Sequence, residues 1–238
     1  MTLYRDEGVV LRTMRLGEAD RIVTMMTKGH GKVRAVAKGV RRTTSKFGAR
    51  LEPLSHVALM CWQGRELDIV NQAEVIESFR VVREDLDRMS KGFTLLEVVD
   101  QISQEHHPAP RLYDMLLGAL RALAEDDSAM LLPAFLLKAL AFDGSSPVVD
   151  RCVSCGATDG LVAFDLVEGG VLCRSCRRGR SVSPEAIGAL RAVLGGGLAE
   201  ALRTPGGPLV DEVGALATEA MEVHLDRRLR SVRASPTA

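Results

Sequence analysis

Four cysteines, arranged as two Cys-x₂-Cys pairs, constrain this chain more than any other feature. Cys152 and Cys155 form the first pair, and Cys173 and Cys176 form the second pair after seventeen intervening residues. This spacing is typical of a four-thiolate zinc site, in which two turns supply the corners of a tetrahedron. Four protein ligands leave no open position for water, so the sequence predicts one structural zinc ion per chain.

The same cysteines allow two other interpretations. A Cys-x₂-Cys pair can be redox-active, and four cysteines can form two disulfides. A redox pair normally occurs once, at the start of a helix, whereas here two pairs flank a glycine-bounded apolar run, 161–164. The spacing therefore favours zinc, with a short hairpin between the pairs. The fifth cysteine, Cys61, lies beside Met60 and Trp62 in an apolar run and is expected to be an inert core thiol.

Charge is distributed unevenly along the 238 residues, although the formal net charge is zero. Residues 1–80 contain fourteen Lys and Arg against nine Asp and Glu, whereas residues 81–150 contain six against twelve. The chain lacks an apolar run long enough to span a bilayer, and its first residues lack the plan of a signal peptide. A cytoplasmic protein without a membrane partner is expected, and a reducing compartment suits the thiolates.

The first eighty residues have the pattern of a small all-β unit. Glycine-containing turns separate five short β-prone runs, at 9–14, 21–27, 32–38, 56–62 and 67–76. Five strands in about eighty residues fit an OB-fold barrel, with an SH3-like barrel as the main alternative. The predicted fold class is thus α+β and multidomain: an N-terminal OB-fold barrel, then an α-helical domain with an inserted four-cysteine zinc module.

A basic stretch within the predicted barrel, residues 28–50, contains eight Lys and Arg and no Asp or Glu. Strand alternation over 32–38 places Val33, Ala35 and Ala37 on one face and the basic side chains on the other. Such a face, continuing into a polar loop at 39–48, suits the phosphates of a nucleic acid. The competing interpretation is a solvated edge strand that prevents aggregation. The candidate DNA-binding residues are Lys32, Arg34, Lys38, Arg41, Arg42, Lys46 and Arg50.

Aromatic residues are scarce near this stretch, where only Phe47 and Trp62 are available for base stacking. Contacts to phosphates should therefore dominate, which predicts weak sequence preference and strong salt dependence.

The period of the apolar residues becomes helical from about Val82. One helix is expected to bury the face made by Met89, Phe93, Leu96, Val99 and Ile102. Further helices are expected at 111–125, at 129–142 (apolar nearly all round), from Pro184 after a Ser183 cap, and at 209–223. Arg227, Arg228 and Arg230 suit either the dipole of that last helix or a contact with a partner or a phosphate. The adjacent His106 and His107 are expected to be solvent-exposed rather than metal ligands.

The predicted domains are the OB-fold at 1–80, a helical domain at 81–150 and 181–232, a zinc module at 151–180 between its two parts, and a frayed tail at 233–238. Several motifs, in this order along the chain, resemble the RecO family of bacterial recombination mediators and DNA repair proteins. They are GEADR at 17–21, HGK at 30–32, AKGVRR at 37–42, SKF at 45–47, LEP at 51–53, GSSP at 144–147 and CVSCG at 152–156.

The resemblance implies the same OB-fold, helical domain and zinc module. It also implies binding to single- and double-stranded DNA and annealing of complementary strands at the nucleoid. The implied partners are RecR and single-strand-binding protein, and the implied outcome is loading of RecA recombinase. The basic residues named above would carry the contacts to DNA.

No enzyme signature competes with this interpretation. The sequence has no phosphate-binding loop of the Gly-x₄-Gly-Lys type, no dinucleotide-binding glycine motif and no His-Glu-x₂-His. Strand annealing needs charge neutralisation rather than covalent chemistry, so a non-enzyme without a small-molecule substrate is expected. The alternative function is a zinc-ribbon adaptor that contacts proteins, with only incidental DNA binding, and the acidic segment 81–150 favours it to some degree.

Overall fold

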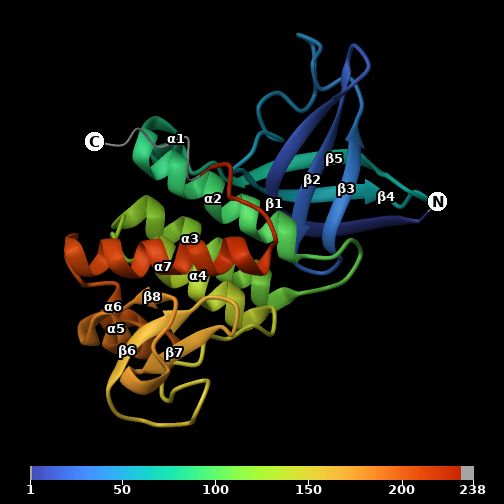
Figure 1. Cartoon of the computed structure of the whole chain (residues 1–238). Coiled ribbons are helices and arrows are strands. Elements are labelled where there is room, and N and C mark those ends of the chain that lie inside the picture. The colour runs from blue at the N-terminus through green and yellow to red at the C-terminus, as the bar shows by residue number, and fades with distance from the viewer. Residues whose placement is uncertain (1, 232–238) are drawn as a thin grey trace. The chain divides into compact units, whose positions relative to one another are not determined.

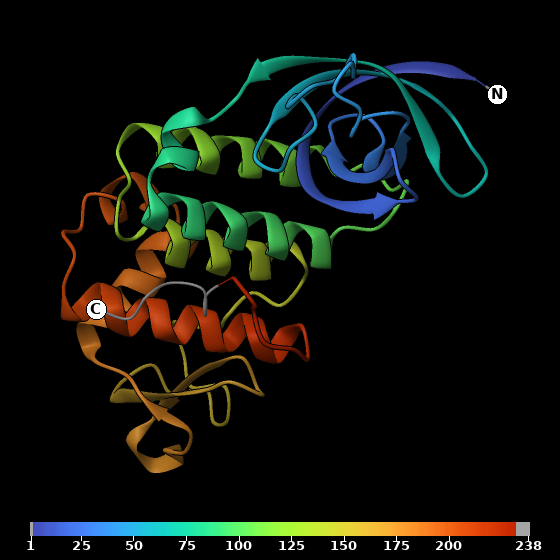
Figure 2. The same cartoon turned by 90° about the horizontal axis from the view of Figure 1, so that it is seen from above.

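Five strands close into a barrel in the N-terminal part of the computed structural model (Figure 1). The strands are β1 (Leu3–Leu16), β2 (Asp20–Thr27), β3 (Gly31–Ala37), β4 (His56–Trp62) and β5 (Asp68–Glu77). They pair in the order β1-β2-β3-β5-β4, and β1 closes the barrel by pairing with both β2 and β4. Figure 2 shows the strands curling around one another. This five-stranded closed barrel confirms the predicted OB-like fold.

The structure describes residues 2–231, so the tail predicted at 233–238 lies outside the described residues. Those residues form two compact units. The first unit contains the chain up to Glu125 together with Ser231, and the second is Asp126–Arg230.

The barrel interior follows from the alternation in β3. Val33, Ala35 and Ala37 are fully buried, as the sequence predicts for the apolar face of this strand. The connection from β3 to β4 adds Phe47 and Leu51, which are 1% and 2% exposed and belong to the same core cluster. Two buried anchors therefore hold this polar connection against the barrel.

Three helices complete the first unit: α1 (Arg80–Glu84), α2 (Leu86–Ile102) and α3 (Pro110–Glu125). The Asp85 side chain caps α2 by accepting a hydrogen bond from the Arg88 amide at 2.9 Å. The predicted buried face of α2 is wrong at Phe93, which is 38% exposed, whereas Leu95 and Val98 are fully buried. The reason is that α2 contacts β1 as well as α1 and α3, so its buried stripe is rotated from the simple helical pattern.

The connection between α2 and α3 lies alongside the start of β3. His106 and His107 are exposed, as predicted, and the His106 amide donates to the Lys32 carbonyl at 2.9 Å. Gly31 makes this close approach possible, because a Cβ built on it would lie 2.0 Å from the His107 carbonyl oxygen. Gly31 also has a positive φ of 68°.

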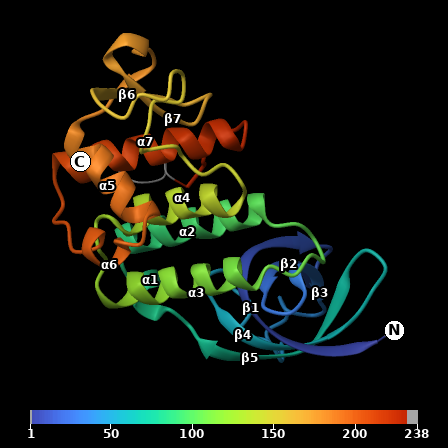
Figure 3. The same cartoon turned by 90° about the horizontal axis from the view of Figure 1, so that it is seen from below.

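The second unit is a set of helices with a small sheet (Figure 3). Its elements are α4 (Leu131–Phe142), β6 (Leu161–Asp165), β7 (Gly170–Cys173), the 3₁₀ helix η1 (Arg174–Cys176), β8 (Arg180–Ser181), α5 (Pro184–Leu194), α6 (Leu198–Ala201) and α7 (Pro208–His224). The hairpin of β6 and β7 between the cysteine pairs is confirmed, and β8 adds a third strand. Ser183 caps α5 by accepting from the Ala186 amide at 3.1 Å, with Pro184 in the first turn, as predicted.

Helix α4 is buried on nearly all sides, as its sequence predicts, and it contacts α5 and α7. Helix α7 ends at His224, so Arg227, Arg228 and Arg230 follow its C-terminal end. Among residues 2–231, no helix combines the length and apolar character that crossing a membrane requires.

A first prediction concerns the approach at Gly31. Replacing Gly31 with Ala should destabilise the first unit by about 2–4 kcal/mol, because the methyl group meets the backbone and the left-handed conformation is strained. Gly17→Ala is the matched control, because Gly17 also has a positive φ of 58° but has open space around its Cβ position. This variant should lose only about 1 kcal/mol of unfolding free energy. Denaturant unfolding followed by Trp62 fluorescence measures both values. Equal losses in the two variants would contradict the close packing at Gly31.

Candidate nucleic-acid interface and metal centre

The four cysteines of the two Cys-x₂-Cys pairs meet at one point in the second unit. The Sγ atoms of Cys152, Cys155, Cys173 and Cys176 all lie within 4.8 Å of one another. Cys155 Sγ and Cys173 Sγ are 3.7 Å apart. A tetrahedron with metal–sulfur bonds of 2.3 Å has edges of about 3.8 Å, so the spacing fits four thiolates around one metal ion.

Local backbone structure produces this arrangement. Cys152 and Cys155 flank a turn in which the Gly156 amide donates to the Cys152 carbonyl at 2.8 Å. Cys173 ends β7 and Cys176 lies in η1, so the second pair also turns back on itself. All five cysteines are free, and a sulfur separation of 3.7 Å is far beyond the roughly 2.05 Å of a disulfide bond. The geometry therefore favours metal binding over the two-disulfide alternative.

The basic strand face is only partly available to solvent. Lys32 has a side chain that is 14% exposed, and its Nζ donates to the Asp100 carbonyl of α2 at 2.6 Å. The same Nζ lies 3.7 Å from Asp100 Oδ1. Arg34 Nη1 lies 3.4 Å from Glu105 Oε1. Each of these two cations thus faces a carboxylate within the first unit.

Asp100 explains why Lys32 is drawn inward. This residue is 9% exposed, and its carboxylate accepts from Arg12 Nε of β1 at 2.5 Å. A buried carboxylate needs nearby positive charge and hydrogen-bond donors. Lys32 and Arg12 provide that charge from β3 and β1, so part of the basic stretch neutralises α2 and is less accessible to a phosphate.

The remaining basic candidates lie at the end of β3 and on the connection from β3 to β4. Lys38 and Arg42 are exposed, and within residues 2–231 neither forms an ion pair with a carboxylate. Arg41 Nη1 donates to the Glu18 carbonyl at 2.8 Å and Lys46 Nζ donates to the Asn71 carbonyl at 2.6 Å. Arg50 donates to the Lys46 carbonyl. Because a backbone carbonyl carries no net charge, the positive charges of Arg41, Lys46 and Arg50 are not neutralised by these hydrogen bonds.

Hydrogen bonds to the β1–β2 turn hold the start of this connection. The Gly39 amide donates to Asp20 Oδ1 at 2.7 Å, and the Arg41 amide donates to the Ala19 carbonyl at 3.0 Å. Lys38 and Arg42 therefore stand at an anchored position beside the barrel rim. Five of the seven candidates therefore lie together on this connection and at its borders: Lys38, Arg41, Arg42, Lys46 and Arg50. The other two, Lys32 and Arg34, lie beside α2 and the segment that follows it.

The two aromatic residues near the basic stretch differ in accessibility. Phe47 is 1% exposed in the barrel core, with Lys46 Nζ 5.0 Å from its ring centroid, so it cannot stack on a base. Trp62, at the end of β4, is 37% exposed.

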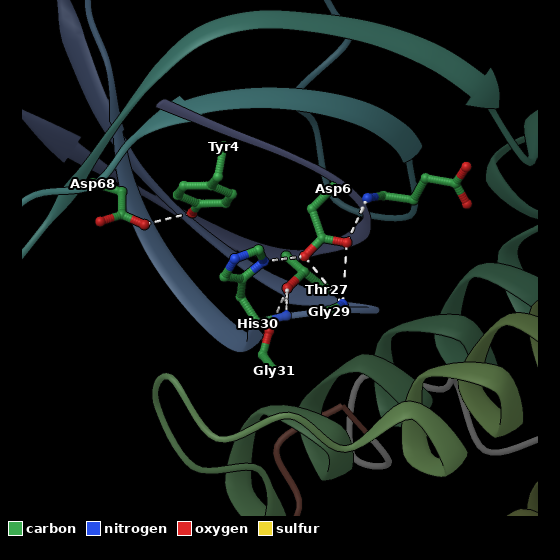
Figure 4. Close-up of polar contacts among 8 residues, drawn as sticks. Tyr4, Asp6, Thr27, Gly29, His30, Gly31 and Asp68 are labelled. Atoms are coloured by element: carbon green, nitrogen blue, oxygen red, sulfur yellow. Dashed lines mark hydrogen bonds and ion pairs between the residues drawn. The ribbon is translucent and has the colours of Figure 1, made fainter. Parts of the chain in front are cut away.

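A polar network that the sequence did not reveal ties together the opposite end of the barrel (Figure 4). Tyr4 Oη donates to Asp68 Oδ2 at 2.5 Å, and the Tyr4 and His30 ring centroids are 4.2 Å apart. Asp6 accepts from the Gly29 amide at 3.1 Å and pairs with His30 Nδ1 at 2.6 Å. Residues 3–8 carry no motif or strong β pattern, and the network joins β1 to the β2–β3 turn and to the start of β5. Only knowledge of the folded strand arrangement would have found it.

Burial affects the titration of two groups in this region. Burial, followed by the hydrogen bond to Asp68, raises the pKa of Tyr4 well above its ordinary value. Burial also raises the pKa of Cys61 to about 12, so this thiol stays protonated near neutral pH. Cys61 is 1% exposed and belongs to the barrel core cluster, as expected for a core thiol.

Comparison with known proteins supports the resemblance carried by the motifs. Residues 1–79 match the family model Recombination protein O N terminal, and residues 83–233 match Recombination protein O C terminal. Relatives named DNA repair protein RecO include those of Streptomyces coelicolor (43% identical over 247 residues), Frankia casuarinae (43% over 243) and Streptomyces griseus (42% over 245). Each alignment covers 98% of this chain and 98% of the relative.

A second prediction concerns the metal centre. Cys173→Ser should lower the bound metal from about one equivalent to near zero and loosen the β6–β7 hairpin, because coordination supplies folding free energy directly. Metal analysis of reduced, chelator-free protein and limited proteolysis of the hairpin are the measurements. Cys61→Ala is the control and should keep its metal, since Cys61 lies in the barrel core and is not one of the four clustered cysteines. Full metal content in Cys173→Ser would contradict the four-thiolate site.

Proposed function

Since this chain belongs to the RecO family, we propose that it is a DNA-binding recombination mediator in DNA repair. The observation that carries this proposal is the group of basic side chains at the rim of the barrel. Lys38 and Arg42 are exposed there without carboxylate partners in residues 2–231, and Arg41, Lys46 and Arg50 lie on the same connection. Such a group suits the phosphates of single- and double-stranded DNA.

The finer part of the proposal concerns the steps after DNA binding. The protein anneals complementary strands and acts with RecR to help load RecA onto DNA coated by single-strand-binding protein. Annealing is limited by repulsion between two polyanions, and bound Lys and Arg side chains reduce that repulsion without covalent chemistry. The role is therefore non-enzymatic, it requires no small-molecule substrate, and it is exercised in the cytoplasm at the nucleoid.

The metal in this proposal is zinc. Four thiolates form a soft, tetrahedral donor set that suits Zn²⁺, and all four positions are taken by protein. When bound, the ion supplies structural stability to the hairpin and no chemistry at DNA. Cys152, Cys155, Cys173 and Cys176 would hold it.

The proposed functional division assigns DNA binding to 1–80, a helical domain to 81–150 and 181–232, and the zinc module to 151–180. The two compact units separate at a different point, between Glu125 and Asp126. Helices α1 to α3 thus share a unit with the barrel. The contacts of Lys32 with Asp100 and of Arg34 with Glu105 agree with this division, because they join β3 to α2 and to the segment after it.

A second candidate function is a zinc-ribbon adaptor that contacts proteins and binds DNA only incidentally. The pairing of Lys32 with Asp100 and of Arg34 with Glu105 favours it, because these cations already have partners within the chain. The two functions differ in how strongly DNA binding depends on salt.

A third prediction tests the barrel-rim cations. Replacing Lys38 and Arg42 together with Ala should weaken binding to single-stranded DNA roughly tenfold or more at about 100 mM salt. The slope of log affinity against log salt concentration should become less negative by about 1.4, because each lost phosphate contact removes about 0.7 from its magnitude. The loss should be nearly equal for different DNA sequences, because phosphates carry no base information. Fluorescence anisotropy with labelled oligonucleotides over a salt series measures these quantities.

The matched control removes the same charge elsewhere. Arg80 and Arg203 are both exposed and lie outside the basic stretch, so the Arg80→Ala, Arg203→Ala variant should keep nearly the parent salt slope. Should the Lys38, Arg42 variant fold normally and retain the parent affinity and slope, the barrel rim is not the DNA surface. The adaptor function would then replace the mediator function.

A further inference from the structure

The outer face of β1, β4 and β5 is arranged in rows that the strand register defines. The first row, at the end of the barrel, is Leu3, Trp62 and Ile69, which are direct partners across the three strands. The second row is Arg5, Met60 and Gln72, and the third is Glu7, Ala58 and Glu74. All nine residues are exposed or half-buried, whereas Cys61, Leu59 and Val70 between them point into the core.

The first row is an apolar platform with an aromatic centre. Leu3 is 41% exposed and Trp62 is 37% exposed, so solvent reaches two large apolar side chains that lie side by side. Apolar surface gathered in this way indicates a binding site more often than isolated exposed residues do. Trp62 is also the only tryptophan in the chain.

The second row brings positive charge to this platform. Arg5 is exposed and forms no ion pair within residues 2–231. Lys46 reaches the same face from the basic stretch, because its Nζ donates to the Asn71 carbonyl of β5 at 2.6 Å. Asn71 in turn lies 3.5 Å from Met60 Sδ, as measured from its Nδ2. Lys46 therefore links the basic connection to the second row, next to the platform.

Distances along the sheet suit a nucleic-acid strand. Successive rows are two residues apart on β1 and β4, or about 6.7 Å, which is comparable with the length of one nucleotide in an extended single strand. On β5 the first two rows are three residues apart, because the register is irregular between Met60 and Cys61. The acidic third row, Glu7 and Glu74, would repel phosphates placed beyond the second row. The favourable area is therefore narrow, which suits one strand and disfavours a duplex.

The network at this end of the barrel fixes the platform (Figure 4). Tyr4, between Leu3 and Arg5 in sequence, points inward and donates to Asp68 at the start of β5. Asp68 Oδ1 also accepts from the Gly64 amide of the β4–β5 turn at 2.9 Å. These bonds hold the ends of β1, β4 and β5 in register, so the row containing Trp62 is ordered before any ligand arrives.

From these observations we propose that Trp62, supported by Leu3 and Ile69, is a stacking site for a base of single-stranded DNA. This inference rests on the proposed function and adds a contact to bases that the basic side chains do not provide. It places that contact on the β1–β4–β5 face, whereas oligonucleotides on OB folds commonly occupy the face of strands 2 and 3. Base–aromatic stacking tolerates any sequence, because every base has a π-face.

The single tryptophan gives a direct test on the full chain. Saturation with an oligothymidylate of about 16 nucleotides should quench Trp62 emission and protect the ring from acrylamide. An oligonucleotide of equal length with abasic sites supplies phosphates without bases and should bind without quenching. A duplex should also leave the emission unchanged, since its bases are already stacked. Anisotropy of labelled DNA under the same conditions reports binding independently.

Variants separate stacking from charge. Trp62→Ala should weaken single-strand binding roughly 5- to 150-fold with an unchanged salt slope, because stacking releases no counterions. Trp62→Phe retains a π-face and should stay within a fewfold of the parent. Met14→Ala is the matched control, since Met14 is an exposed apolar residue of the same barrel (49% exposed) outside the platform, and should bind as the parent does.

The outcomes that overturn this proposal differ from those that overturn the proposed function. If anisotropy shows saturable, salt-dependent binding but Trp62 emission and acrylamide access do not change, the stacking site is wrong and the proposed function stands. Equal quenching by the abasic oligonucleotide would also exclude stacking. Absence of salt-dependent binding would remove the proposed function itself. Should Trp62→Ala fail to fold, the emission of the unmodified chain and the affinity of Trp62→Phe decide whether a base stacks on Trp62.

Discussion

Closure of the barrel through one long strand is the constraint on which the first unit depends. The first half of β1 pairs with β4 and the second half pairs with β2, and Gly8 and Val9 pair on both edges. An irregularity in register between Val10 and Arg12 lets the strand bend between these two partners. Closure removes exposed strand edges, and it also brings Leu3 beside Trp62 and Tyr4 over Asp68. The apolar platform and the polar network beneath it both follow from this pairing.

The helices beside the barrel decide which cations remain available. Asp100 is buried on α2 and attracts Arg12 and Lys32, while Glu105 after α2 faces Arg34. One of the Asp100 oxygens has no hydrogen-bond partner, so the carboxylate still depends on the nearby positive charge. Cations near the start of β3 therefore stabilise the first unit, and cations beyond its end are free for phosphates. A continuous basic stretch in sequence thus divides into two groups with different physical roles.

Sequence patterns predicted much of the fold and metal site because those features depend on local rules. The β3 alternation, the Ser183 cap and the Cys-x₂-Cys spacing each act within a few residues. The missed features depend on partners distant in sequence. Phe93 lies on the regular apolar face of α2 but is exposed, because α2 also contacts β1. The sequence alone predicts Lys32 to be a surface cation, and only the folded position of Asp100, sixty-eight residues away, shows that its side chain turns inward.

The two proposed DNA contacts contribute different energies, and their combination suits a protein that anneals strands. Phosphate contacts at Lys38 and Arg42 attract single strands and duplexes alike, so they cannot by themselves favour a strand that is still unpaired. A base stacked on Trp62 is available only in a single strand, so this contact supplies the discrimination. A base held on the protein is unavailable for pairing, however, and a long row of aromatic residues would oppose annealing. One tryptophan on the barrel surface restrains a strand at a single point and leaves its other bases free to find their complement.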